Sequence, residues 1–340
     1  MRRLVVVLLA GLLVLAACSD DGGEDVSNGQ EPLGGSDDSV ALAPSSEDEP
    51  AVVPDPCAPG RPAPSGQTAE TLTVDGAERT YLLDVPETYD GVEAVPLILN
   101  LHGSGSDARQ QVGYSGLPEA AAEVGAVVAS LDGTGTPRGF GISPTSRDIQ
   151  VITTLLDQLS ERFCIDEDRV SSVGISNGSA TSAILACGLD GRLASVGLVA
   201  ATVGPFDCAG ETRVSVIAFH GTGDQAVPYD GGGVSSASGG AANGLDVPPA
   251  EVGIAAWAEQ DGCGDEPATT AVAADVRLWQ FPACEAGTAV ELYRLDGVGH
   301  VWPGSSVPFD LLEDRLGPNT DSIVASQLIV DFIATHPRRR

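Results

Sequence analysis

Short apolar runs alternate with amphipathic segments along most of the chain. The runs at residues 96–101, 126–131 and 214–219 consist largely of Val, Leu, Ile and Ala, and a shorter run at 169–173 carries two Val residues. Such runs are typical of strands buried on both faces. Residues 149–163 place apolar side chains at steps of three and four, and this spacing predicts an amphipathic helix. Strands that alternate with helices predict the α/β class, with a mostly parallel sheet flanked by helices.

Residues 71–85 show a different pattern, in which polar and apolar positions alternate on either side of Asp75-Gly76. This dipeptide tolerates positive φ angles, so the segment predicts a β-hairpin. The remaining predicted elements are a strand at 290–295 and helices at 180–186, 254–259 and 322–335.

The N-terminus combines two arginines with an apolar stretch at residues 4–15. This stretch is too short to span a bilayer comfortably and fits the hydrophobic region of a signal peptide. It ends in Leu-Ala-Ala-Cys at residues 15–18, which resembles the bacterial lipobox. We therefore expect residues 1–17 to be a lipoprotein signal peptide and Cys18 to carry the lipid. Ordinary cleavage, with Cys18 as an incidental thiol, is the alternative.

Residues 19–56 contain eleven acidic residues and no basic or aromatic residue. Such a segment cannot bury enough apolar surface to offset the entropy of ordering it. We expect residues 18–56 to form the lipidated cysteine and a disordered acidic tether, with an acidic interaction tail as the alternative. Residues 57–340 then form the folded domain, which is long enough for one large core.

The charged residues exclude several kinds of chemistry. All 17 basic residues are arginine, which excludes a Walker A phosphate loop, a Schiff-base lysine and a Ser-Lys dyad. A formal net charge of −31 repels nucleic-acid phosphates and anionic lipid headgroups. We expect no nucleic-acid partner, membrane contact only through the lipid anchor, and a neutral or apolar small-molecule or oligomeric substrate. No protein partner is implied.

The strongest motif for chemistry is Gly-Ile-Ser-Asn-Gly at residues 174–178. The motif alone is weak, but here it connects the predicted strand at 169–173 to a helix. A nucleophile elbow needs this context, because the serine sits on a strained turn and the flanking glycines let the backbone approach closely. Ser176 is therefore the candidate nucleophile.

An activated serine needs a base and a carboxylate that orients the base, in the chain order Ser, acid, His. Of the four histidines, His300 in a glycine-rich loop after the strand at 290–295 has the right place in this order. Asp224 is the preferred acid because it follows the strand at 214–219 most directly. The competing acids are Asp207, Asp230 and Asp261, and the other histidines are His102, His220 and His336.

A glycine-rich turn follows the strand at 96–101, where Leu-His-Gly-Ser-Gly occupies residues 101–105. Such a turn supplies a second backbone N–H for an oxyanion hole. We assign the hole to the N–H groups of Ser104 and Asn177. A plain strand-to-helix loop is the competing interpretation.

Together these motifs resemble the secreted polyhydroxybutyrate-depolymerase and feruloyl-esterase family of α/β-hydrolases. The resemblance covers roughly residues 57–302 and rests on Leu-His-Gly at 101–103, the elbow, His-Gly-Thr-Gly-Asp with Val-Pro-Tyr at 220–229, and Gly-His-Val-Trp-Pro-Gly at 299–304. It implies an α/β-hydrolase fold and a serine esterase without a cofactor. Ser176, Asp224 and His300 then correspond to the family's nucleophile, acid and base.

The resemblance also implies that Trp302, together with His102, lines the substrate cleft, although a lone tryptophan is as often plain core. One departure is Ser179 after the elbow glycine, where glycine or another small residue is expected. This departure affects the neighbouring packing and leaves the three catalytic candidates in place.

Six cysteines remain in the exported domain once Cys18 is set aside, and an even number in an oxidising compartment predicts disulfides. Fifteen pairings are formally possible, and buried free thiols are the alternative. Sequence neighbourhood and the family resemblance favour Cys57 with Cys164, Cys187 with Cys208, and Cys263 with Cys284. No metal-binding or dinucleotide-binding motif is found, so we expect no metal.

The sequence thus predicts an exported, membrane-anchored carboxylic-ester hydrolase acting on short-chain, hydroxyalkanoate-oligomer, feruloyl or acetyl esters. Two alternatives remain open. One is an envelope acyltransferase with the same triad, and the other is a catalytically silent binding lipoprotein.

Overall fold

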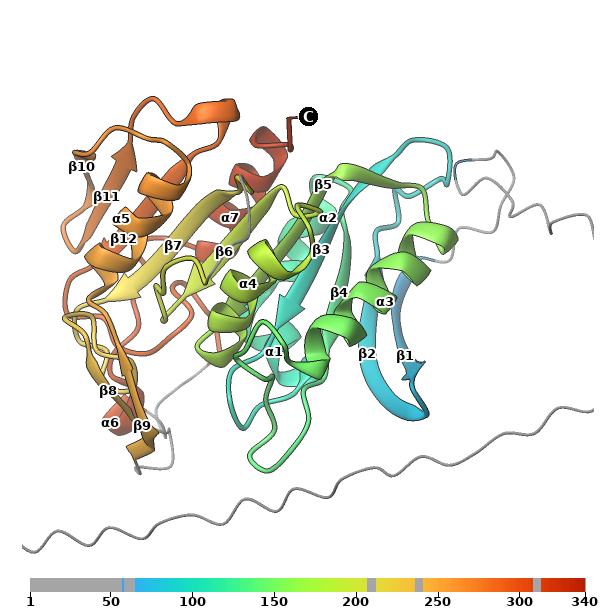
Figure 1. Cartoon of the computed structure of the whole chain (residues 1–340), viewed down its shortest axis with the longest axis horizontal. Helices are drawn as coiled ribbons and strands as arrows, with labels where there is room; N and C mark the ends of the chain where they lie inside the picture. Colours follow the sequence, from blue (N-terminus) through green and yellow to red (C-terminus); the bar gives the residue numbers. More distant parts are fainter. Residues whose placement is uncertain (1–56, 58–64, 207–211, 236–240, 308–312, 340) are drawn as a thin grey trace, which may run out of the picture. The chain divides into compact units, whose positions relative to one another are not determined.

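The computed structural model describes residues 57, 65–206, 212–235, 241–307 and 313–339 (Figure 1). The described residues all belong to one compact unit, Val53–Arg340. The predicted signal peptide, Cys18 and the acidic segment lie outside the described residues.

This unit is built on one ten-stranded sheet. Its strands are β1 Gly66–Val74, β2 Ala77–Val85, β3 Val95–Leu101, β4 Val127–Leu131, β5 Ile165–Ile175, β6 Ser195–Val199, β7 Ser215–Gly221, β10 Ala268–Ala273, β11 Val276–Phe281 and β12 Val290–Leu295. Their order is β1-β2-β4-β3-β5-β6-β7-β12-β11-β10. The six strands from β4 to β12 in this order pair in parallel. At one edge β2 pairs antiparallel with β4 and β1 with β2, and at the other edge β11 pairs antiparallel with β12 and β10 with β11. A separate pair consists of β8 Gly232–Ser235 and β9 Ala241–Val247.

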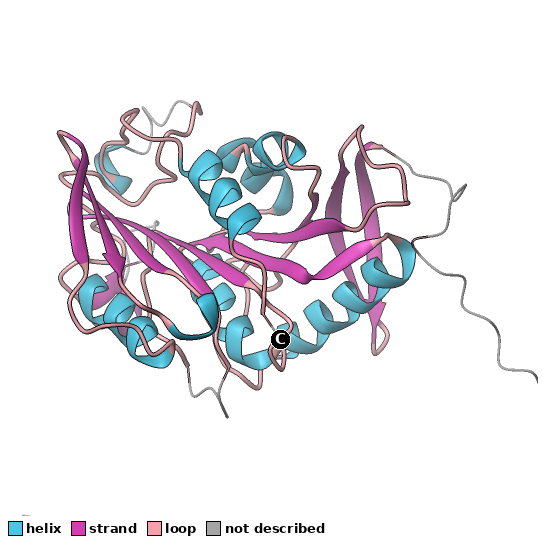
Figure 2. Ribbon diagram, turned by 90° about the horizontal axis from the view of Figure 1, so that it is seen from above, coloured by secondary structure: helices cyan, strands magenta, loops and turns pink. Residues whose placement is uncertain are grey.

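Helices cover both faces of the sheet, as Figure 2 shows. They are α1 Ala108–Ser115, α2 Leu117–Ala122, α3 Arg147–Arg162, α4 Asn177–Gly188, α5 Ala250–Gln260, α6 Glu313–Leu316 and α7 Ala325–Thr335, with a short 3₁₀ turn η1 at Glu285–Gly287. One apolar core lies between the sheet and α3, α4 and α5. A second core lies on the opposite face, between the sheet and α2 and α7.

Strand β3 shows why the central strands are largely apolar. Leu97, Leu99 and Leu101 belong to the core under α3, α4 and α5. Ile98 points the other way and packs with Leu117 of α2. Because successive side chains point to opposite faces and both faces are covered, the strand has no exposed side. The predicted α/β class is confirmed.

The first hairpin also forms as predicted. Strands β1 and β2 pair in register down to Val74 and Ala77. The two residues between them, Asp75 and Gly76, have φ angles of 49° and 74°. Positive φ at both positions is what a tight two-residue hairpin turn requires.

Two of the three predicted disulfides are present, Cys57–Cys164 and Cys263–Cys284. Cys187 is also disulfide-bonded, and its predicted partner Cys208 lies outside the described residues. Within the ranges given above, no helix is both long and apolar enough to cross a membrane.

Candidate functional site

Ser176 lies at the sharp turn between β5 and α4. Its backbone angles are φ 57° and ψ −116°, a conformation that residues with a side chain rarely adopt. The turn is held at its centre, because Ser176 N–H donates to the carbonyl of Val199 on β6 over 2.8 Å. The Ser176 side chain is half-buried. This is the geometry of a nucleophile elbow.

The two glycines of the elbow motif are required by close backbone contacts. A Cβ atom at Gly174 would overlap the backbone of Gly178. A Cβ atom at Gly178 would in turn overlap the carbonyl of Leu101 at the end of β3. Any side chain at either position would therefore force β3, β5 and α4 apart.

Asp224 follows β7 and is buried, with 6% of its surface exposed. Its Oδ1 accepts hydrogen bonds from the N–H groups of Ala226 at 2.9 Å and Val227 at 2.8 Å. Its Oδ2 accepts one from Nδ1–H of His300 at 2.8 Å. Burial alone would raise the pKa of this carboxyl, but the imidazoles of His220 and His300 outweigh burial and lower the pKa to about 2. The side chain is therefore a carboxylate at neutral pH.

His300 follows β12 in a loop that is packed tightly by backbone contacts. Its own N–H donates to the carbonyl of Leu316, and the N–H of Gly299 donates to Pro318 at 2.8 Å. A Cβ atom at Gly299 would overlap the carbonyl of Leu316. The His300 side chain is buried, with 9% of its surface exposed.

The loops that carry Asp224 and His300 are joined directly. Gly223 N–H donates to the carbonyl of Val298, and Thr222 N–H donates to the carbonyl of Leu295, each over 2.8 Å. In return, Gly297 N–H donates to the hydroxyl of Thr222 at 2.8 Å. The acid and base loops therefore form one hydrogen-bonded unit.

Ser176, Asp224 and His300 all lie at the same edge of the sheet. They follow the carboxyl ends of β5, β7 and β12, which are parallel members of one run of strands. The Asp224–His300 hydrogen bond uses Nδ1 of the imidazole, so Nε2 is left as the nitrogen that can accept a proton. A histidine in this tautomer can act as a general base toward a neighbouring hydroxyl.

The two amides assigned to an oxyanion hole flank the elbow. Ser104 follows Gly103, and a Cβ atom at Gly103 would lie only 3.4 Å from Cβ of Ser176. Asn177 begins α4, where a backbone N–H has no partner within its own helix. Neither amide donates a hydrogen bond to any described residue. Both N–H groups are therefore available to a developing negative charge, and their role stays a prediction.

The structure corrects the prediction that Trp302 and His102 line the substrate cleft, because both side chains are buried. Trp302 is 1% exposed and its Nε1–H donates to the hydroxyl of Ser326 at 2.9 Å, so it belongs to the core beside α7. His102 is 0% exposed, and its Nε2 accepts from the N–H of Gly133 at 2.9 Å. Burial also lowers the pKa of His102. Both side chains therefore make buried hydrogen bonds to neighbouring segments, His102 to the loop that begins at Gly133 and Trp302 to α7.

The side chain of Asn177 has a role that the sequence did not reveal. Its Oδ1 accepts from Phe140 N–H at 2.7 Å, and its Nδ2 donates to the Phe140 carbonyl at 3.0 Å. The amide thus mimics a strand partner and ties the loop of residues 133–141 to the elbow. Ser179 is also accommodated, since its buried hydroxyl donates to the Ala201 carbonyl at 2.7 Å.

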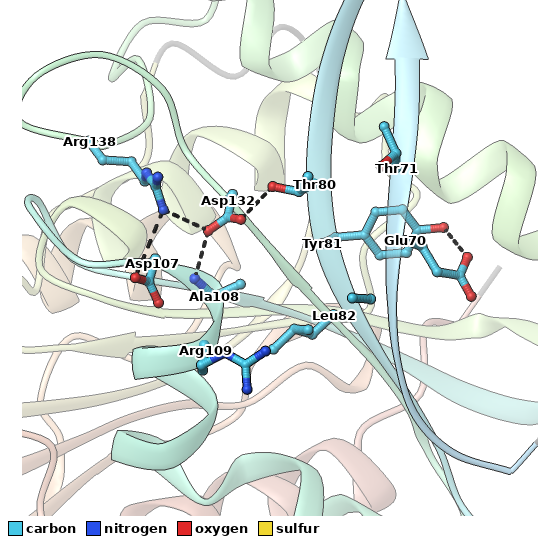
Figure 3. A pocket seen from close by; sticks show the side chains of 11 residues that line it. Glu70, Thr71, Thr80, Tyr81, Leu82, Asp107, Ala108, Arg109, Asp132 and Arg138 are labelled. Atoms are coloured by element: carbon cyan, nitrogen blue, oxygen red, sulfur yellow. Dashed lines mark hydrogen bonds and ion pairs between the residues drawn. The ribbon is translucent and has the colours of Figure 1, made fainter.

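A cavity of about 310 Å³ lies between the β1–β2 hairpin and the start of α1. Figure 3 shows Asp132 among the lining side chains, accepting from the hydroxyl of Thr80 at 2.6 Å and pairing with Arg138 at 3.3 Å. The Arg138 carbonyl accepts from Gly105 N–H at 2.7 Å. None of the three candidate catalytic side chains lines this cavity, whose polar groups brace the 133–141 loop.

Of the competing acids, the two that the structure describes, Asp230 and Asp261, do not contact His300. Asp230 is exposed, and Asp261 is fully buried at the end of α5, where burial raises its pKa to about 6. Asp207 lies outside the described residues. In the described ranges, no group of three or more His, Cys, Asp or Glu side chains is arranged to hold a metal ion.

No known family profile matches the chain. Over 250 residues it is 26% identical to feruloyl esterase B of Piromyces equi, an alignment that covers 69% of this chain and 45% of that protein. Over 285 residues it is 27% identical to NocK of Nocardia uniformis subsp. tsuyamanensis, whose esterase designation is provisional, with 78% and 82% covered. The chain therefore spans about half of the first relative and most of the second.

Among solved structures, the acetyl xylan esterase from Aspergillus awamori superimposes with a TM-score of 0.53 at 13% identity. The match covers 74% of this chain and 99% of that one. At 13% identity, the similarity is evidence for a shared fold alone. Together with the strand order, it shows that the chain has the α/β-hydrolase fold.

Proposed function

We propose that this chain is a carboxylic ester hydrolase that works through an acyl-enzyme on Ser176. The observation that carries the proposal is the strained backbone of Ser176, at φ 57° on the sheet edge where the Asp224–His300 pair also lies. Strain of this kind persists only where the surrounding structure enforces it, and it is concentrated at functional sites. The feruloyl esterase relative supports the same reaction.

In the proposed reaction, Oγ of Ser176 attacks the ester carbonyl carbon while Nε2 of His300 removes the hydroxyl proton. The carbonyl oxygen becomes an oxyanion, which accepts hydrogen bonds from the amides of Ser104 and Asn177. Collapse of this intermediate releases the alcohol, which takes the proton from His300. Water then attacks the acyl-enzyme while His300 takes one of its protons. Collapse of the second intermediate breaks the bond to Oγ of Ser176, which takes that proton back from His300, and the carboxylic acid leaves.

Asp224 holds the imidazole in this scheme and carries no proton itself. Its hydrogen bond to Nδ1–H fixes the tautomer, and its negative charge stabilises the imidazolium that forms in each half-reaction. Because Oδ1 is held by two backbone N–H groups, the carboxylate stays oriented while the histidine cycles.

The substrates we propose are short-chain, hydroxyalkanoate-oligomer, acetyl or feruloyl esters. The relative named as a feruloyl esterase supports the feruloyl member of this set. A panel of soluble aryl esters, hydroxybutyrate oligomers, feruloyl esters and acetylated xylan, assayed on the purified protein, ranks these classes by kcat/KM.

Ser176→Ala tests the reaction itself. Removing the nucleophile is expected to lower kcat on the best ester of the panel on the order of 10³-fold or more, with an unchanged unfolding midpoint. A fluorophosphonate probe should label the wild type and leave Ser176→Ala unlabelled. Ser179→Ala is the matched control, since it removes a serine hydroxyl three residues later, in the first turn of α4, and should keep most of the activity. A well-folded Ser176→Ala that retains more than about a tenth of wild-type kcat contradicts the proposal.

We also propose that the protein is exported and lipid-anchored through Cys18. The disulfides support an oxidising compartment, because such bonds persist outside the reducing cytosol. When the full-length chain is expressed in a bacterial host, the wild type should enter the detergent phase and Cys18→Ala should not. Equal partitioning of the two proteins means that this cysteine carries no anchor.

A further inference from the structure

We infer that His220 is a positioning residue that orients Asp224 for the proposed hydrolysis. The inference rests on the proposed function, because it assigns a supporting role within the same Ser-His-Asp site. His220 lies four residues before the acid, near the end of β7, and its side chain is 2% exposed.

The hydrogen bonds of His220 fix its tautomer. Its Nδ1 lies 3.3 Å from the backbone N of Thr202, and an amide N–H can only donate, so Nδ1 is an acceptor. The Thr202 hydroxyl, at 3.2 Å, reaches the same nitrogen. The ring proton therefore resides on Nε2, the nitrogen that faces the acid loop.

The Nε2–H group holds both ends of the acid turn. It donates to the carbonyl of Val227 at 2.9 Å and lies 3.4 Å from Oδ2 of Asp224. Val227 N–H already donates to Oδ1 of the same carboxylate. The imidazole thus closes a ring of contacts around Asp224, and Oδ2 is left aimed at His300.

His220 cannot itself be the base, because both of its ring nitrogens are occupied by buried partners. Its ring is also fixed from the side, since the Tyr229 ring meets it edge-on with centroids 5.5 Å apart. A residue needed only to fill space here would not require two correctly placed ring nitrogens. The arrangement assigns His220 a directional task, which is to hold the carboxylate plane.

Three substitutions separate this task from simple packing. The amide nitrogen of Gln in His220→Gln reaches the position of Nε2, whereas the amide of His220→Asn reaches only the position of Nδ1, and His220→Phe keeps the ring shape alone. A misplacement of about 1 Å costs up to about 100-fold in rate, so we expect kcat losses of roughly 10- to 100-fold for Asn and Phe. His220→Gln should stay within about 5-fold of the wild type. KM should change little in all three.

A second measurement tests whether His220 acts through the acid. In an Asp224→Asn background, His220→Phe should cause no further loss of kcat, because the group that it orients is already altered. Equal loss in both backgrounds overturns the inference, and so does a folded His220→Phe with wild-type kcat. If His220→Phe does not fold, the two amide variants decide. A higher kcat for His220→Gln than for His220→Asn supports the inference, and an equal or lower one overturns it. Ser176→Ala, assayed alongside, reports separately whether the proposed function holds.

Discussion

Asp224 shows how one carboxyl is kept charged inside the protein. Burial by itself favours the neutral acid, whereas two backbone N–H groups and the imidazoles of His220 and His300 favour the carboxylate. The hydrogen bonds prevail, and the pKa falls to about 2. Because the unfolded chain has a higher pKa at this position, the charge of Asp224 stabilises the folded state above that value.

The stability of the protein should therefore depend on pH through Asp224. The pKa is lowered from 3.8 to about 2, so the contribution is present above about pH 4 and is lost as the pH falls toward 2. This difference between the unfolded and folded pKa values corresponds to a free energy of about 2 kcal/mol. Urea unfolding of the wild type and Asp224→Asn between pH 6 and pH 2 should show the stability difference narrowing by this amount. A difference that does not change with pH is the contrary result.

The residues of the candidate site were predictable to different degrees. Ser176 follows from its motif, because two glycines around a serine between a strand and a helix encode a backbone shape. Asp224 and His300 follow from their positions after strands. The burial of Trp302 and the contacts of His220 were not predictable, since both depend on segments that are distant or irregular, such as the Ser326 and Thr202 regions.

The elbow is the element whose sequence is most constrained by its neighbours. Gly174 and Gly178 stand where β5, α4 and the end of β3 meet backbone to backbone. By contrast, Gly113 inside α1 has open space where a Cβ atom would stand. The same substitution should therefore have opposite effects at these sites.

Gly174→Ala and Gly178→Ala should each destabilise the protein by about 3 kcal/mol, because the new methyl group overpacks against backbone that cannot rotate away. Gly113→Ala, the control, should stabilise it by about 0.5 to 1 kcal/mol through helix propensity. Denaturant unfolding of the three variants measures both effects. Elbow variants as stable as the wild type would mean that the close contacts relax freely.

The helix with the clearest periodicity was predicted well, and several elements without a clear sequence signal were missed. The helix predicted at 149–163 is α3 at Arg147–Arg162, and the final helix is α7. Strand β6 was missed because Gly197 interrupts its short apolar run. The glycine fits a close contact, since a Cβ atom there would come within 3.0 Å of Val173 on β5. Strand β10 was missed because it lies at an exposed edge and lacks a run of large apolar residues.

At the scale of the whole molecule, the two described disulfides join segments that are separated in the sequence. Cys57–Cys164 links residues 107 positions apart, and Cys263–Cys284 links residues 21 apart. A crosslink restricts the unfolded chain more when the loop that it closes is longer. The first bond should therefore contribute more to the free energy of unfolding.

Replacing both cysteines of the Cys57–Cys164 pair with serine should lower the unfolding free energy by about 4 to 5 kcal/mol, and the Cys263–Cys284 pair by about 3 kcal/mol. Guanidinium unfolding of the two double variants under non-reducing conditions provides the comparison. The reverse order would show that native-state packing around the bonds, rather than loop length, determines their effect.

The position of Cys57 also determines how the molecule bears mechanical load. Tension applied through the N-terminus meets Cys57 before β1, and the disulfide passes it to Cys164, the residue directly before β5 in the middle of the sheet. The edge hairpin, which would otherwise peel away first, is bypassed. The span of 107 residues stays closed, so about 370 Å of contour length is withheld from extension. A protein held at a surface by its N-terminus would therefore keep its edge strands in place under shear.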